Sequence, residues 1–171
     1  MSLLDIVSQE VKDPRRLQGQ RISLPNAFVI IVISHLCGYY SGRKIAKFGK
    51  THEVTFTELL GLKHGVPSHV IFTDIQNRID EKEFISAFNK WTSTYIPVNE
   101  GDRVSGDGKV LGSTVEHVST RHQNFKAIVS LFCQTSGLIK SIQAYEQKKM
   151  NEINIVQYLI GLLKDKGLIF F

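Results

Sequence analysis

The N-terminal half of the chain spaces its apolar residues as amphipathic helices do. A first stripe covers residues 3–11 and ends before Pro14, because proline disfavours the helical conformation in the residue ahead of it. Residues 27–40 are apolar on nearly all sides, which is typical of a buried central helix, and Pro25 suits its first turn. We therefore predict two helices separated by a basic linker over residues 15–21.

Further helical patterns complete this half of the chain. They cover residues 43–61, 69–78 and 81–94. Ser68 is a suitable N-cap for the second of these helices, and Asp80 for the third. The apolar positions of the third fall at i, i+3, i+4 and i+7, as in a helix that buries one face. The pattern predicts a packed helical domain over residues 25–97.

The C-terminal half changes to a β-rich pattern. Runs suited to strands cover residues 103–111, 125–133 and 138–145, followed by an apolar run over 168–171. Residues 134–137 form a turn between the second and third runs, and residues 112–124 are predicted to be a loop. Asn151 begins a helical pattern that extends to residue 166. We divide the chain into a helix and linker (1–24), a helical domain (25–97) and a β-rich domain (98–171).

Composition narrows the class of protein. The chain has 171 residues, 42% of them hydrophobic and 22% charged, with a formal net charge of +5. This is a globular composition whose charge favours an anionic partner such as nucleic acid. Cys37 and Cys133 lie far apart without the spacing of a zinc site, so we expect a reducing cytoplasm. The apolar run over 27–33 is too short for a membrane helix, and no signal peptide is found.

Two features are candidates for function. Arg43, Lys44, Lys47 and Lys50 form a basic helix face, which is suited to salt-dependent contacts with DNA phosphates. An ordinary solvated helix face explains these residues equally well. Asp107 lies between two glycines within a predicted strand. By itself the triplet is more simply a turn, and only the residues around it favour a catalytic carboxylate.

Several segments, in the same order along the chain, resemble a known family. These segments are Cys37-Gly38, Asp107-Gly108-Lys109 and residues 45–49, 61–69, 84–91, 128–130, 136–138 and 149–153. Together they resemble the H-repeat-associated insertion-sequence transposases, with their N-terminal associated domain. Asp107-Gly108-Lys109 is similar to the catalytic Ile-Asp-Gly-Lys motif of that family. The resemblance covers residues 17–171, nearly the whole chain.

The resemblance implies a bacterial DDE-type transposase that acts on the DNA ends of an insertion sequence. In such enzymes three carboxylates hold two Mg²⁺ ions, which activate water or a DNA 3′-hydroxyl. Asp107 is then the first catalytic and metal-binding carboxylate, and Lys109 lies near substrate phosphate. The implied fold class is α+β, with an N-terminal helical bundle followed by an incomplete ribonuclease H-like α/β domain. We expect a cytoplasmic protein with no membrane partner.

The sequence departs from the family where catalysis would take place. Gly106 replaces an apolar residue before the Asp, and the chain ends on the strand after which the second carboxylate is expected. We therefore expect a truncated transposase that is inactive alone, so whether the chain is an enzyme stays open. Alternatively, it is a non-catalytic DNA-binding or oligomerising module that self-associates or regulates an intact transposase. A poorly folding remnant is the third reading.

Overall fold

A computed structural model describes residues 2–95, 99–111, 126–146, 154, 157, 161 and 169–170. The chain divides into two compact units, Met1–Ala87 and Phe88–Phe171. The boundary between the units falls within one helix, α6, which spans Glu81–Tyr95. The domain limits predicted at residues 24 and 97 stay predictions.

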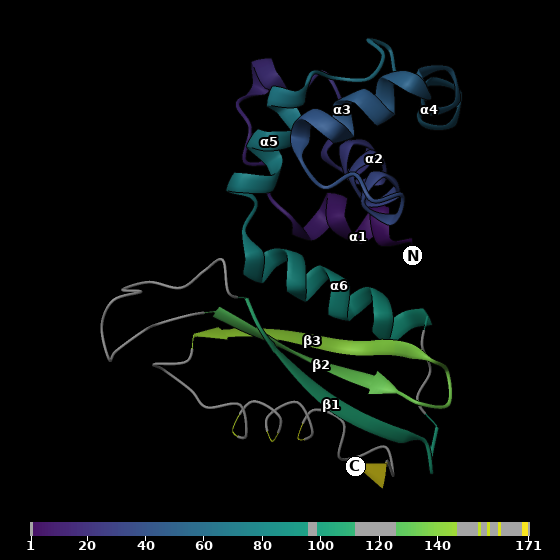
Figure 1. The fold of residues 1–171 in the computed structure, drawn as a ribbon, viewed down its shortest axis with the longest axis vertical. Coiled ribbons are helices and arrows are strands. Elements are labelled where there is room, and N and C mark those ends of the chain that lie inside the picture. Colours follow the sequence, from purple (N-terminus) through teal and green to yellow (C-terminus); the bar gives the residue numbers. More distant parts are fainter. Residues whose placement is uncertain are drawn as a thin grey trace. The chain divides into compact units, whose positions relative to one another are not determined.

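The first unit is helical, as predicted. Its helices are α1 (Leu3–Glu10), α2 (Leu24–Leu36), α3 (Gly42–Thr51), α4 (Glu53–Leu60), α5 (His69–Arg78) and the first part of α6 (Figure 1). Short polar side chains cap the N-termini of several of these helices. The hydroxyls of Ser23 and Ser41 accept hydrogen bonds from backbone N–H groups in the first turns of α2 and α3. Asp80 accepts two such bonds at α6, which satisfies donors that have no partner within the helix.

The predicted helix over residues 43–61 is two helices, α3 and α4, with His52 between them. Two further boundaries in this unit differ from the prediction. The central helix ends at Leu36 rather than at residue 40, because the chain turns at Gly38, whose φ of +84° suits glycine. The predicted linker over residues 15–21 contains a short 3₁₀ helix, Leu17–Gly19. Arg15 is buried there, forms an ion pair with Asp13 at 2.6 Å and donates to a backbone carbonyl. A buried, paired arginine packs as part of the fold, and the role of this segment as a linker stays a prediction.

The core of the first unit comes from the inner faces of these helices. Its fully buried side chains include Ile6, Ala27, Ile30, Ile45 and Phe72. Burial of a large aliphatic or aromatic side chain contributes about 1.5–3 kcal/mol each. α2 contributes one buried face to this core, but Val32 and Leu36 are 41% and 83% exposed, so the helix is not buried on all sides as its apolar sequence predicted.

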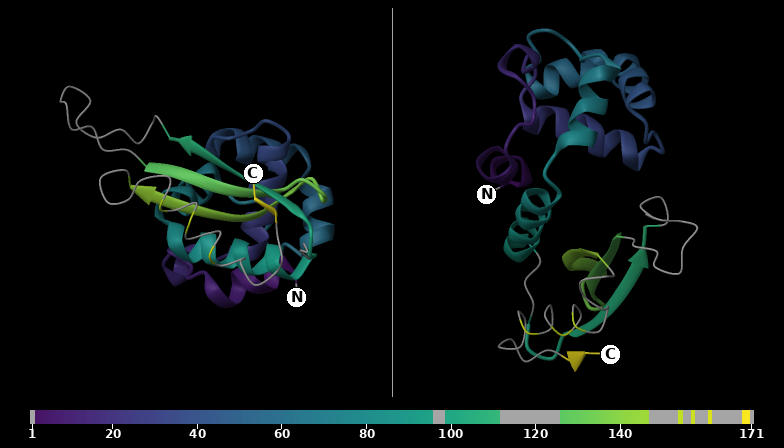
Figure 2. Two further views of the ribbon diagram at one scale, coloured as in Figure 1. Left: turned by 90° about the horizontal axis from the view of Figure 1, so that it is seen from below. Right: turned by 90° about the vertical axis from the view of Figure 1, so that its left-hand side faces the viewer.

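The second unit contains a twisted sheet. Its strands are β1 (Arg103–Val110), β2 (Lys126–Cys133), β3 (Leu138–Glu146) and β4 (Ile169–Phe170). In the described residues the strand order is β3-β2-β1-β4. β1, β2 and β3 pair antiparallel, whereas β4 runs parallel to β1 (Figure 2). The α+β class and the three long strands are confirmed to within about a residue.

Two predicted segments of this unit fall largely outside the described residues. These are the loop over 112–124 and the helix over 151–166, of which Asn154, Gln157 and Gly161 are described as helical.

The second half of α6 runs along β3 (Figure 1). The Asn89 side chain donates from Nδ2 to the carbonyl of Ile142 and accepts from its N–H, both at 2.9 Å. Thr92 Oγ1 donates to the carbonyl of Lys140 at 2.7 Å. Side chains of α6 thus satisfy backbone groups that the edge strand would otherwise offer to another chain.

None of the helices in the described ranges is long and apolar enough to cross a lipid bilayer.

Candidate functional site

Helix α3 is fixed against its neighbours by small residues on its inner face. Gly42, Ile45 and Gly49 are buried. A side chain at position 42 would overlap Thr73 Oγ1 and approach the His69 carbonyl oxygen to 3.0 Å. The two glycines therefore let the α3 backbone approach α5 and the loop before it closely. With this face fixed inward, the charged residues are left on the outside.

The cations of α3 are all exposed. They are Arg43, Lys44, Lys47 and Lys50, and the helix contains no acidic residue. Lys50 Nζ forms an ion pair with Glu53 Oε1 at 2.6 Å. Within the described parts of the chain, the other three cations have no ion pair. Arg43, Lys44 and Lys47 thus form an exposed positive surface whose charge is not compensated locally.

Glu53 fixes the loop between α4 and α5. Its Oε1 atom accepts from Lys50 Nζ and, at 2.9 Å, from the backbone N–H of Val66. Gly65 has φ +65°, and a side chain there would overlap the Glu53 carboxylate. The hydrogen bond from Lys50, together with the one from Val66, lowers the pKa of Glu53 below its ordinary value. Sequence reasoning missed this role, because the acid and its loop are thirteen residues apart.

Asp107 lies in the middle of β1, not in a turn. It is exposed and pairs with Ser130 of β2, whose hydroxyl donates to the Asp107 backbone oxygen at 3.4 Å. Ser105 and Lys109 share its sheet face because side chains alternate along a strand. β4 lies on the other side of β1, where Ile169 and Phe170 pair with Arg103 and Val104. The turn interpretation of the triplet was therefore wrong.

The resemblance implies a divalent metal at Asp107. Within the described residues no group of three or more His, Cys, Asp or Glu side chains comes together. A two-metal site requires several oxygen ligands, so these residues alone do not fit one. The role of Asp107 as a metal ligand stays a prediction.

Lys109 is exposed on β1, in a different unit from α3. Its grouping with the α3 cations as a DNA contact therefore stays a prediction.

A pair of tyrosines beside α3 was not predicted to be functional. Tyr39 and Tyr40 lie between α2 and α3 and are 38% and 66% exposed. The signal that the sequence offered was an aromatic pair between the Gly38 turn and a basic helix. Large aromatic side chains are more often buried, so an exposed pair was not expected.

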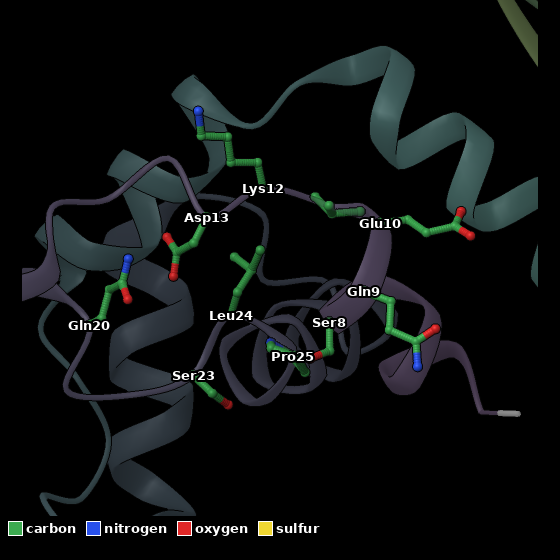
Figure 3. Close-up of a pocket in the computed structure, with 10 residues that line it drawn as sticks. Ser8, Gln9, Glu10, Lys12, Asp13, Gln20, Ser23, Leu24 and Pro25 are labelled. Atoms are coloured by element: carbon green, nitrogen blue, oxygen red, sulfur yellow. The ribbon is translucent and has the colours of Figure 1, made fainter.

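A shallow depression of about 600 Å³ lies in the first unit, between α1 and the segment that leads to α2. Ser8, Glu10, Lys12, Asp13 and Gln20 line part of it. In Figure 3 the carboxylates of Glu10 and Asp13 point to different sides, and Asp13 is already paired with Arg15. These side chains do not converge as catalytic groups must.

Comparison with known proteins gives one family and one relative. The chain is 27% identical over 159 residues to a Xanthobacter autotrophicus protein named "Uncharacterized protein in dhlA 3'region". The match covers 92% of this chain and 52% of that protein, so the chain spans about half the length of its relative. No solved structure matches. The DDE_Tnp_1-associated pattern matches residues 7–92, half of the chain, and its domain is part of DDE transposase families. The chain therefore belongs to the DDE_Tnp_1-associated family and is related to transposases.

Proposed function

We propose that this chain takes part in DNA transposition and that α3 is its DNA-binding element. The observation that carries the proposal is the placement of charge. α3 carries four cations and no acid, whereas the whole chain has a net charge of only +5. α3 thus places three cations that have no ion pair with any described residue on one exposed helix within the family-matched segment.

Such a surface is suited to the DNA backbone. Lysine and arginine side chains contact phosphates and release condensed counterions, which gives affinity that depends on salt but not on base sequence. The close packing of α3 against α5 fixes the backbone that carries these cations, so binding need not order the helix itself. In this proposal α3 positions the protein on DNA, and contacts elsewhere read the ends of the element.

We further propose that the second unit is the beginning of a ribonuclease H-like domain. The strand order β3-β2-β1-β4, with β4 parallel to β1, supports this. In this proposal Asp107 is the first carboxylate of a divalent-metal site and Lys109 contacts substrate phosphate. Asp107 lies in the middle of β1, and β1 pairs with β4. This placement supports the assignment of Asp107. Because no group of three or more His, Cys, Asp or Glu side chains forms within the described residues, the proposal requires metal ligands from other residues.

The DNA-binding proposal is tested with charge-matched variants. Lys44→Glu with Lys47→Glu reverses two exposed cations of α3, and Arg16→Glu with Lys82→Glu reverses two exposed cations elsewhere in the same unit. We expect the α3 variant to weaken binding of a labelled duplex about tenfold or more at low salt, because it loses phosphate contacts. Fluorescence anisotropy measures the affinity. Equal losses in both variants would show a general charge effect and contradict the proposal.

A further inference from the structure

Tyr40 presents an open aromatic face. It is 66% exposed, and its ring stacks on His35, with centroids 5.6 Å apart and an interplanar angle of 28°. The imidazole covers one side of the phenol ring and supports it from α2. An exposed ring held in this way resembles the aromatic platforms on which nucleic acid bases stack.

The position of Tyr40 is fixed by two helices. Its carbonyl oxygen accepts from Gln76 Nε2 of α5 at 3.1 Å and lies 3.3 Å from His35 Nε2 of α2. Gln76 and His35 also contact each other, with their Nε2 atoms 3.4 Å apart. Because the residue is already ordered, little further ordering is required when a ligand stacks on it.

Tyr39 continues the aromatic surface onto α3. Its ring lies 5.1 Å from that of Phe48, which in turn lies 4.6 Å from the ring of His52. Phe48 lies one turn along α3 from Lys44, on the same helix face, because residues four apart are neighbours on a helix surface. An aromatic ring therefore lies beside Lys44.

Two of the acids on the neighbouring helices, Asp74 and Glu53, form ion pairs. Asp74 of α5 forms an ion pair with Arg78 at 3.1 Å, and Glu53 of α4 with Lys50 at 2.6 Å. Their negative charges are partly compensated, so they oppose an anion at Lys44 and Lys47 less than free carboxylates would. The local charge thus suits a polyanion.

We propose that Tyr39, Tyr40 and the exposed cations of α3 form a binding site for single-stranded DNA. An unpaired base stacks on Tyr40, and its flanking phosphates contact Lys44 and Lys47. Bases within a duplex stack on each other, so an exposed ring favours unpaired bases. This inference rests on the proposed function, because it requires α3 to bind DNA, and it specifies the form of DNA.

The test uses the full chain with a labelled oligo(dT) 15-mer and a 15-base-pair duplex. Tyr40→Leu removes the planar ring but keeps an apolar side chain. Tyr95→Leu is the control, because Tyr95 is 52% exposed on α6. We expect Tyr40→Leu to weaken oligo(dT) binding about fivefold or more, with less than about a twofold change for the duplex. Tyr95→Leu should change neither.

A second readout reports stacking directly. The chain has one tryptophan, Trp91, so Tyr40→Trp in a Trp91→Phe background places a single indole at the proposed platform. We expect oligo(dT) to quench its fluorescence, because bases stack on aromatic rings. Binding without quenching would overturn the inference. Circular dichroism checks that each variant keeps its helical content.

The two proposals fail in different ways. If Lys44→Glu with Lys47→Glu binds both DNAs as tightly as the parent chain, the proposed function of α3 is wrong. If that variant loses binding while Tyr40→Leu keeps its affinity for oligo(dT), α3 binds DNA but Tyr40 is not a stacking platform. If Tyr40→Leu weakens duplex and oligo(dT) binding equally, preference for unpaired bases is refuted.

Discussion

Glu53 shows how one carboxylate can determine the shape of a surface loop. It accepts from Lys50 and from the Val66 N–H, so it connects the end of α3 to the loop before α5. The ionised form makes both bonds, which is why the pKa of Glu53 is lowered. Folding therefore favours the deprotonated carboxylate.

This coupling predicts a pH dependence for the variant Glu53→Gln. A carboxyl group whose pKa is lowered by folding contributes stability above its ordinary value, here 4.5, and loses it as the pH falls through the lowered pKa. We expect Glu53→Gln to lower the melting temperature at pH 7, and the difference from the parent chain to shrink toward pH 3. Differential scanning calorimetry measures both. A difference that is constant with pH would mean that only the shape of the side chain matters.

At the scale of elements, the sequence predicted helix α6 but not its contacts with strand β3. The spacing of apolar residues predicted α6, because burial of one face leaves a period of 3.6. It did not predict that Asn89 bonds to both backbone groups of Ile142. Asn89 and Ile142 are 53 residues apart, and nothing local marks an asparagine that completes a sheet edge.

The variant Asn89→Ala tests this edge. It leaves the part-buried N–H and carbonyl of Ile142 without their partner, which costs about 1 kcal/mol of unfolding free energy. We expect this loss in urea denaturation, with faster hydrogen exchange at the Ile142 amide. The control is Ser93→Ala, an exposed position on the same helix, where we expect a change below about 0.5 kcal/mol. An unchanged exchange rate at Ile142 would show that the edge is protected in another way.

The boundaries of the elements show what local patterns can and cannot predict. The limits of α5 and β2 were predicted to within about a residue, since a helical apolar period and turn residues mark them locally; Ser68 stands at the N-cap position of α5, but its side chain makes no capping hydrogen bond. The central helix was extended too far because Tyr39 and Tyr40 continue its apolar run, whereas Gly38 turns the chain. The candidate site shows the same limit of local sequence patterns. The basic face of α3 was visible in the sequence, but the aromatic contacts beside it depend on tertiary structure.

At the scale of the whole molecule, the placement of charge matters more than its sum. A net charge of +5 is modest for 171 residues, and spread evenly it would give only weak, non-specific attraction to DNA. Arg43, Lys44 and Lys47 instead form a local group of cations on α3 that have no ion pair with the described residues. Several phosphates can then be contacted together, and each contact releases counterions.

Salt dependence gives a quantitative test of this arrangement. For duplex DNA the logarithm of the binding constant falls with the logarithm of salt concentration by about 0.9 per phosphate contact. Lys44→Gln with Lys47→Gln removes two contacts without adding negative charge, so we expect the slope to become shallower by about 1.8. Arg16→Gln with Lys82→Gln should leave the slope unchanged, because these exposed cations lie outside α3. Anisotropy titrations between about 50 and 200 mM salt cover the range in which such contacts dominate. If the α3 variant binds more weakly at every salt concentration but keeps the parent slope, its lysines act through the fold, and the phosphate contacts must be assigned to another surface.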